Sequence, residues 1–167
     1  ARLYVGTYSR SLLFGTGEVF EGKGKGIHTY LFDMEKGTLM EEGAPTETAN
    51  PSFVSLSADK KLLYAVNELT TFEGKKGGAL NTYRRAENGE LTLLSQKATG
   101  GEDPCHVVTD RERKMVLVSN YSGGSLAICP LNKDGVPVGE AQVIRHMGKG
   151  RNPARQEGPH VHSITFT

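Results

Sequence analysis

Apolar positions in this chain occur in short runs, and the stretches between the runs are rich in Gly, Asp, Asn and Lys. The run at 62–67 reads LLYAVN, a second at 115–120 reads MVLVSN, and a weaker copy at 3–8 reads LYVGTY. Short apolar runs bounded by turn-forming residues predict β-strands. Because no segment shows helical periodicity, the pattern predicts an all-β fold.

The predicted strands belong to a longer repeat. A second shared segment follows each run, at 26–32, 78–84 and 124–130, and a third segment begins at Pro51, Pro104 and Pro159. These prolines lie 53 and 55 positions apart. A period of about fifty residues made of short strands and Gly-rich turns is typical of a β-propeller blade with four antiparallel strands.

Within a blade, the sequence predicts four strands ordered from the central axis outward. The innermost strands are expected at 51–57, 104–109 and 159–164. Alternating strand direction brings the long connections to one face of the disc, and these are 9–25, 69–77, 99–103 and 145–158. Long irregular loops on a rigid scaffold commonly carry function, so this face is expected to hold the site.

The chain is too short for a closed ring. Its 167 residues hold about three repeats, whereas a propeller closes with about four to eight blades. Residues 1–167 are therefore predicted to form the N-terminal part of a single, incomplete propeller domain. The remaining blades would come from the same protein, if the chain is a fragment, or from a second chain. A fragment is favoured, because an open ring exposes apolar blade faces.

Charge, apolar run length and cysteine content indicate which partners and which cellular location to expect. A formal net charge of +1 gives no reason to expect a nucleic acid or a membrane surface as partner, and no apolar run reaches the length of a spanning helix. Cys105 and Cys129 fall on strands that are not neighbours, so no disulfide is expected between them. This cysteine content favours a cytoplasmic location.

The last long connection concentrates groups that can act on an anionic substrate. Residues 145–162 contain three Arg, one Lys and three His. Because side chains alternate along a strand, His160 and His162 are expected on the same side, with Arg155 in the loop above them. Imidazoles beside a guanidinium group can hold an anion and activate water.

Other interpretations of this segment remain open. The loop is also compatible with one buried structural His and with solvated Arg and Lys side chains. The His pair with Glu157 as a third ligand would suit a metal, but no Cys or Asp cluster accompanies it, and no metal or other cofactor is expected. His106 aligns with Val161 instead of with either His, which favours a structural role.

Polar residues near the strand ends are of two kinds. Those that recur between units are expected to cap loops through side-chain hydrogen bonds, and they are Asn50, Asn67, Asp103 and Asn120. Glu68 differs, because the next unit has Tyr121 in its place. A carboxylate at this position is suited to orienting a water molecule or a sugar hydroxyl.

Six segments resemble a known family. They are GTY at 6–8, NPS at 50–52, YAVNE at 64–68, PCH at 104–106, SNYSGGS at 119–125 and RQEGPHVH at 155–162. Together they resemble the seven-bladed β-propeller lactonases, which include a bacterial type of 6-phosphogluconolactonase and the fungal carboxy-cis,cis-muconate cyclases. The resemblance implies a ring of seven blades, of which this chain would hold about the first three, and hydrolysis of a sugar lactone without a metal.

The resemblance and the residue patterns together predict a hydrolase that converts a sugar lactone, 6-phosphogluconolactone, to 6-phosphogluconate. The expected catalytic residues are His160, His162 and Glu68. The expected substrate-binding residues are Arg155, Arg151, Gln156 and Asn120. Two alternatives remain: a binding platform without catalysis, and a diverged family member such as a muconate cyclase. A lactonase needs the basic and imidazole groups to converge on one pocket, whereas a platform does not.

Overall fold

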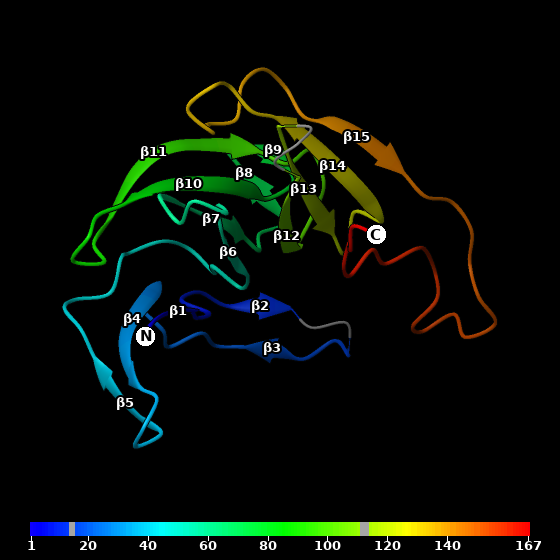
Figure 1. Cartoon of the computed structure of the whole chain (residues 1–167). Helices are drawn as coiled ribbons and strands as arrows, with labels where there is room; N and C mark the ends of the chain where they lie inside the picture. The colour runs from blue at the N-terminus through cyan, green and yellow to red at the C-terminus, as the bar shows by residue number, and fades with distance from the viewer. Residues whose placement is uncertain (14–15, 111–113) are drawn as a thin grey trace.

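The computed structural model describes residues 1–13, 16–110 and 114–167. These residues form three antiparallel sheets that stand side by side as adjacent blades, with the first sheet at the lower left of Figure 1 and the third at the right. Two small hairpins accompany the sheets. The all-β propeller architecture expected from the repeat is therefore confirmed, with about three blades present.

The strand bounds follow the predicted repeat closely. The first blade contains, in spatial order, β1 (Arg2–Gly6), β4 (Ile27–Asp33) and β5 (Thr38–Glu41). The second contains β6 (Val54–Leu56), β7 (Leu62–Asn67), β10 (Ala79–Arg85) and β11 (Leu91–Ala98). The third contains β12 (Pro104–Asp110), β13 (Met115–Asn120), β14 (Ser125–Pro130) and β15 (Gln142–Arg145). The hairpins pair β2 (Leu12–Leu13) with β3 (Val19–Phe20), and β8 (Thr71–Phe72) with β9 (Lys75–Lys76), inside connections expected to be irregular.

Two of the three predicted innermost strands form, and the third does not. The strand β12 begins at Pro104 as expected, and β6 begins only at Val54. Residues 159–164 contain no strand, so the prediction is wrong for this segment. A strand needs a hydrogen-bonded neighbour, and none of the described strands pairs with 159–164.

The strand β7 is buried on both faces because it stands in the middle blade. All six of its residues are buried. Tyr64 and Val66 belong to a core cluster shared with Val118 of the third blade, whereas Leu63 packs in a second cluster with Ile27 of the first blade. Successive side chains point to opposite faces, so burial on both sides explains why the run at 62–67 is almost continuously apolar.

The pairing of strands within each blade shows which positions of the repeats are equivalent. Tyr4 lies opposite Thr29 in the first blade, and Tyr64 lies opposite Thr82 in the second. This register makes the Thr-Tyr pair at 29–30 equivalent to the Thr-Tyr pair at 82–83. An alignment of Gly26 with Gly78, which begin the two segments, would differ from it by one position. Tyr4 and Tyr64 are therefore structurally equivalent.

Each of these tyrosines connects its blade to the next one. The hydroxyl of Tyr4 donates to the carbonyl oxygen of Gly89 at 2.9 Å, and the hydroxyl of Tyr64 donates to that of Gly135 at 2.6 Å. Both glycines lie in the turn between the third and fourth strands of a blade, with φ angles of 91° and 76°, which glycine adopts without steric cost. The repeat thus contains its own interblade contact.

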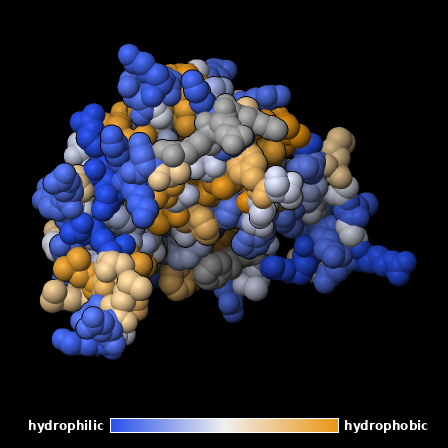
Figure 2. Space-filling model, viewed as in Figure 1, coloured by the Kyte–Doolittle hydropathy of each residue, from blue (hydrophilic) through white to orange (hydrophobic). Residues whose placement is uncertain are grey.

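The outermost strand of the first blade presents apolar side chains to solvent. All four residues of β5 are exposed, including Leu39 and Met40, and Figure 2 shows apolar residues over this strand at the lower left. None of the described ranges contains a helix long and apolar enough to cross a membrane.

Candidate functional site

A pocket of about 320 Å³ is lined by the long connections. Its walls come from parts of the chain that are distant in sequence: the hairpin β2–β3, the ends of β7 and β13, the connection before β12, and the loop at 154–160. Of the predicted site residues, Glu68, Arg155 and His160 line it. The connections expected to form the functional face therefore enclose a pocket of small-molecule size.

Each blade contributes one residue to the site region from the same repeat position, just after β1, β7 or β13. These residues are Tyr8, Glu68 and Tyr121. The hydroxyl of Tyr8 donates to Oε2 of Glu68 at 3.1 Å, and Glu68 and Tyr121 line the pocket. Sequence reasoning missed Tyr8 and Tyr121 as site residues, although their shared position with Glu68 is the signal that identifies them.

Glu68 is half-buried at the end of β7. Burial raises the pKa of its carboxyl above the ordinary value of 4.5, and hydrogen-bonding neighbours, Tyr8 among them, lower it only in part. The carboxylate of Asp103 nearby adds to the rise. Glu68 therefore keeps its proton to a higher pH than a solvent-exposed glutamate does.

Asp103 is a second perturbed carboxyl in the pocket. Its side chain is nearly fully buried, burial raises its pKa, and its Oδ1 has no hydrogen-bond partner among the described residues. Its equivalent in the previous blade, Asn50, is a loop cap as predicted, because its Oδ1 accepts from the N–H groups of Ser9 and Arg10 at 2.9 and 2.8 Å. Asp103 thus keeps a buried oxygen without a hydrogen-bond partner among the described residues, whereas the equivalent Oδ1 of Asn50 is fully used.

Tyr121 brings the two predicted catalytic histidines together. The ring of His160 stacks on Tyr121 with centroids 4.5 Å apart and planes at 22°, and His162 meets Tyr121 edge-on at 5.3 Å. Both imidazoles therefore contact the same tyrosine, although residues 159–164 do not form the strand from which that arrangement was expected.

The Cys105 side chain contacts the backbone of residues 161 and 162, with which none of the described strands pairs. Its Sγ lies 3.4 Å from the carbonyl oxygen of His162 and 3.7 Å from that of Val161. Burial raises the pKa of the Cys105 thiol to about 12. The thiol is therefore protonated at neutral pH and acts as a weak donor to these carbonyls, not as a nucleophile.

His160 presents one ring nitrogen for chemistry. Its Nε2 lies 3.0 Å from Oε1 of Glu157, and its Nδ1 is buried with no hydrogen-bond partner in the described part of the chain. The side chain of Glu157 is exposed. Because a carboxylate only accepts hydrogen bonds, the contact with Glu157 places the proton of the neutral imidazole on Nε2 and leaves Nδ1 as the basic nitrogen.

The other predicted substrate-binding residues do not line the pocket. Gln156 forms a hydrogen bond within its own loop, in which its Oε1 accepts from the N–H of Asn152 at 3.1 Å. Arg151 is exposed outside the lining. Asn120 is fully buried and its amide donates to Oγ of Ser125 at 3.1 Å. In the described part of the chain the Asn120 side chain therefore makes a buried hydrogen bond between β13 and β14.

His106 also lies outside the pocket lining. Its ring packs against Phe53 with centroids 4.4 Å apart. Burial lowers the pKa of His106, and the charge of nearby His162 lowers it further. The aromatic contact supports the structural role expected from the repeat alignment.

A comparison with known protein families decides what kind of propeller this is. The family model for the lactonases with a seven-bladed β-propeller matches residues 2–167. The chain belongs to the seven-bladed β-propeller lactonase family. The match covers all three blades, so the family assignment rests on the whole repeat and not on the basic loop alone.

Curated relatives of this lactonase-family chain include two bacterial enzymes. The 6-phosphogluconolactonase of Bacillus subtilis (strain 168) is 34% identical over 165 residues, which is 98% of this chain and 42% of the relative. The 6-phosphogluconolactonase of Formosa agariphila is 29% identical over 144 residues, 86% of this chain and 40% of the relative. The chain therefore spans less than half the length of these relatives.

Solved structures agree with this assignment. A Bacteroides fragilis protein, provisionally described as a 6-phosphogluconolactonase, superposes with a TM-score of 0.84 at 34% identity, covering 99% of this chain and 42% of that protein. A periplasmic gluconolactonase of Pseudomonas aeruginosa superposes with a TM-score of 0.74 at 28% identity, covering 92% and 40%. Lactonases of this architecture thus match all three blades of the present chain.

Among residues 1–13, 16–110 and 114–167 of this lactonase-family chain, no group of three or more His, Cys, Asp or Glu side chains is placed to hold a metal ion. The alternative of a metal bound by His160, His162 and Glu157 therefore has no support from the geometry.

Replacing Glu68 with Gln is expected to change the pH dependence of the stability of this lactonase-family chain. Because burial raises the folded-state pKa of Glu68, the stability associated with its protonated form is fully present below about pH 4.5 and is lost as the pH rises through the folded-state value. Because glutamine does not ionise, the Glu68→Gln variant does not lose this stability as the pH rises. The free energy of unfolding of the variant, measured by denaturant titration, should rise relative to the parent between pH 4 and pH 8.

The matched control is Glu35→Gln, since Glu35 is exposed on the first blade. Its stability curve should run parallel to that of the parent over the same pH range. If the Glu68→Gln curve also runs parallel, the buried carboxyl does not titrate as the structure indicates.

Proposed function

We propose that this chain forms part of a lactonase that hydrolyses a sugar lactone, 6-phosphogluconolactone, to 6-phosphogluconate. The observation that carries the proposal is the convergence of His160, Glu68 and Arg155 on one pocket formed by the long connections. A platform without catalysis has no need for this convergence. The names of the relatives support the same substrate class. A cytoplasmic location remains the expectation that accompanies the proposal.

The proposed step begins with water. His160 Nδ1 accepts a proton as the water oxygen attacks the lactone carbonyl carbon, while Glu157 accepts the hydrogen bond of Nε2–H and stabilises the imidazolium that forms. The bond between the carbonyl carbon and the ring oxygen then breaks. The ring oxygen leaves with a proton from the Glu68 carboxyl, whose raised pKa suits it to the role of general acid.

The charges of the pocket constrain where a phosphate can lie. Four carboxyl groups line it, from Glu68, Glu102, Asp103 and Glu157, against one guanidinium group, that of Arg155. A phosphate is repelled by the acidic side and attracted to Arg155. The substrate would therefore bind with its lactone ring toward Glu68 and its phosphate toward Arg155, with additional cations supplied by the blades outside this chain.

The test is a hydrolysis assay on the complete seven-bladed ring. Production of 6-phosphogluconate from freshly generated 6-phosphogluconolactone should exceed the spontaneous rate, which is measured in parallel without protein. A rate equal to the spontaneous one, for a ring shown to be folded, would leave the binding platform as the better description. A muconate cyclase would instead turn over an unsaturated dicarboxylate lactone and leave the sugar lactone untouched.

A further inference from the structure

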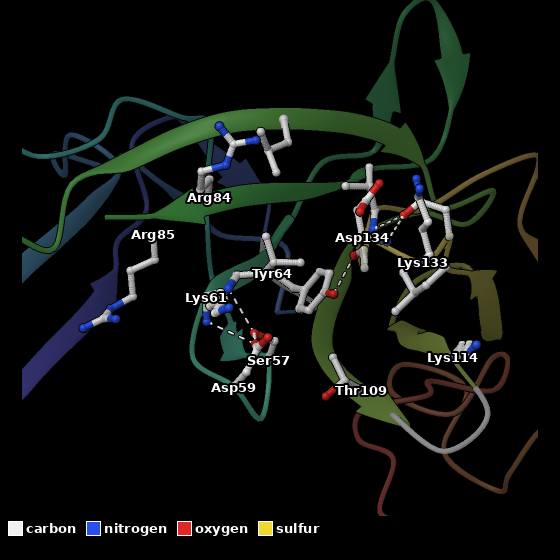
Figure 3. Close-up of a pocket in the computed structure, with 16 residues that line it drawn as sticks. Ser57, Asp59, Lys61, Tyr64, Arg84, Arg85, Thr109, Lys114, Lys133 and Asp134 are labelled. Atoms are coloured by element: carbon white, nitrogen blue, oxygen red, sulfur yellow. Dashed lines mark hydrogen bonds between the residues drawn. The ribbon is translucent and has the colours of Figure 1, made fainter. Parts of the chain in front are cut away.

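A second and larger concavity lies at the seam between the second and third blades, away from the candidate active site. It encloses about 1060 Å³ and is lined by the turn between β6 and β7, the ends of β10 and β12, and the turn between β14 and β15. None of its lining residues belongs to the pocket of the candidate active site. Figure 3 shows this groove with Tyr64 between the two blades.

Leucines at the second seam occupy the positions of two arginines at the first. Between the first and second blades, Arg2 donates to the carbonyl oxygen of Glu87 at 2.8 Å, and Arg85 donates to the hydroxyl of Tyr4 at 3.0 Å. In the register set by the strand ladders, Leu62 occupies the position of Arg2 and Leu131 that of Arg85. Shorter apolar side chains leave this seam open.

The floor of the groove is apolar. Leu62 belongs to the buried core cluster between the two blades, and Leu94 and Leu131 pack against that cluster. All three line the groove. A ligand here can therefore bury an apolar part against leucine side chains.

The rim of the groove is basic. Five of its lining residues are cationic, Lys61, Arg84, Arg85, Lys114 and Lys133, and two are acidic, Asp59 and Asp134. Within the part of the chain that the structure describes, the side chains of Lys61, Arg84, Lys114 and Lys133 form no ion pair. In Figure 3, Lys61 and Lys133 lie on opposite sides of Tyr64. The excess of cations attracts an anion to the space between them.

We propose that this groove is a second binding site, which takes a small organic phosphate. The phosphate would lie between the rim lysines Lys61 and Lys133, and the apolar part of the ligand would lie on the floor formed by Leu62 and Leu131. The groove is complete within this chain, because both blades that form it are present. The proposal does not depend on lactonase activity.

The test is equilibrium dialysis of the 167-residue chain against 4-nitrophenyl phosphate at low ionic strength. Binding is expected to weaken as salt is added, because rim charges are screened. The double variant Lys61→Gln with Lys133→Gln should raise the Kd about tenfold, since each exposed ion pair contributes modestly. Inorganic phosphate, which lacks the apolar part, should bind about tenfold more weakly.

Two controls separate this site from the rest of the molecule. The double variant Lys36→Gln with Lys97→Gln removes the same charge from exposed positions outside the groove, and its Kd should stay within about twofold of the parent. Arg155→Gln removes the guanidinium of the candidate active-site pocket, and binding of the probe at the groove should persist in this variant. The proposal is overturned if the chain does not bind the probe, if both lysine double variants behave alike, if inorganic phosphate binds equally well, or if Arg155→Gln abolishes binding.

Discussion

Replacing His160 with Ala is expected to lower kcat for lactone hydrolysis by about 10² to 10⁴-fold, the usual contribution of a general base. The reason is geometric: His160 is the predicted catalytic histidine that lines the pocket. Its Nε2–H is bound by Glu157, so Nδ1 is the ring nitrogen that can receive the proton of the attacking water. KM should change little, because the imidazole acts in the transition state and not in holding the substrate. The measurement is a steady-state assay on the complete ring, corrected for spontaneous hydrolysis.

Two further histidine variants test whether the loss of kcat is specific to His160. His146→Ala removes an exposed imidazole from the same connection and should leave kcat unchanged. His162→Ala should have a smaller effect than His160→Ala, since His162 contacts the edge of Tyr121 but does not line the pocket. Full turnover by His160→Ala would remove this residue from the mechanism.

Replacing Arg155 with Ala should weaken binding of the phosphorylated lactone by about 1.5 to 3 kcal/mol, the range for a charge-assisted hydrogen bond. Arg155 is the guanidinium that lines the pocket, and the carboxyl groups opposite it would repel a phosphate that has lost this partner. Binding is measured as KM, or as the inhibition constant of the product 6-phosphogluconate, on the complete ring. An unphosphorylated sugar lactone should bind almost equally well to the parent and the variant.

Arg151→Ala is the matched comparison for Arg155→Ala. Arg151 belongs to the same basic loop but lies outside the pocket lining, so its loss should have little effect on either lactone. Equal losses for both lactones in Arg155→Ala would mean that Arg155 supports the fold of the loop and does not bind phosphate.

Strand positions in the middle blade were predictable because their pattern follows from local chemistry. The expected strand at 62–67 coincides with β7, where the apolar run ends at turn-forming residues. The segment 159–164 has the same local pattern as the other innermost strands, yet it forms no strand here. Pairing depends on a neighbour in space, which no local pattern supplies.

The candidate site was predictable only in outline. The basic loop indicated Arg155 and His160, and both line the pocket. The same reasoning predicted Asn120 as a substrate-binding residue, whereas the structure buries its side chain completely. Tyr8 and Tyr121 were missed because a tyrosine at a strand end is also a common structural residue. Their contacts with Glu68 and His160 place them beside predicted site residues.

The sequence by itself determined the all-β class, the blade period and the set of connections that carry the site, because these depend on the alternation of side chains and on the spacing of turns. Only the tertiary structure decided which polar groups share a pocket. It brought Tyr8 to Glu68 across 60 positions and opened the groove where Leu62 and Leu131 replace two arginines. These outcomes depend on how neighbouring blades pack against each other, and that packing is set by the shapes of side chains far apart in the chain.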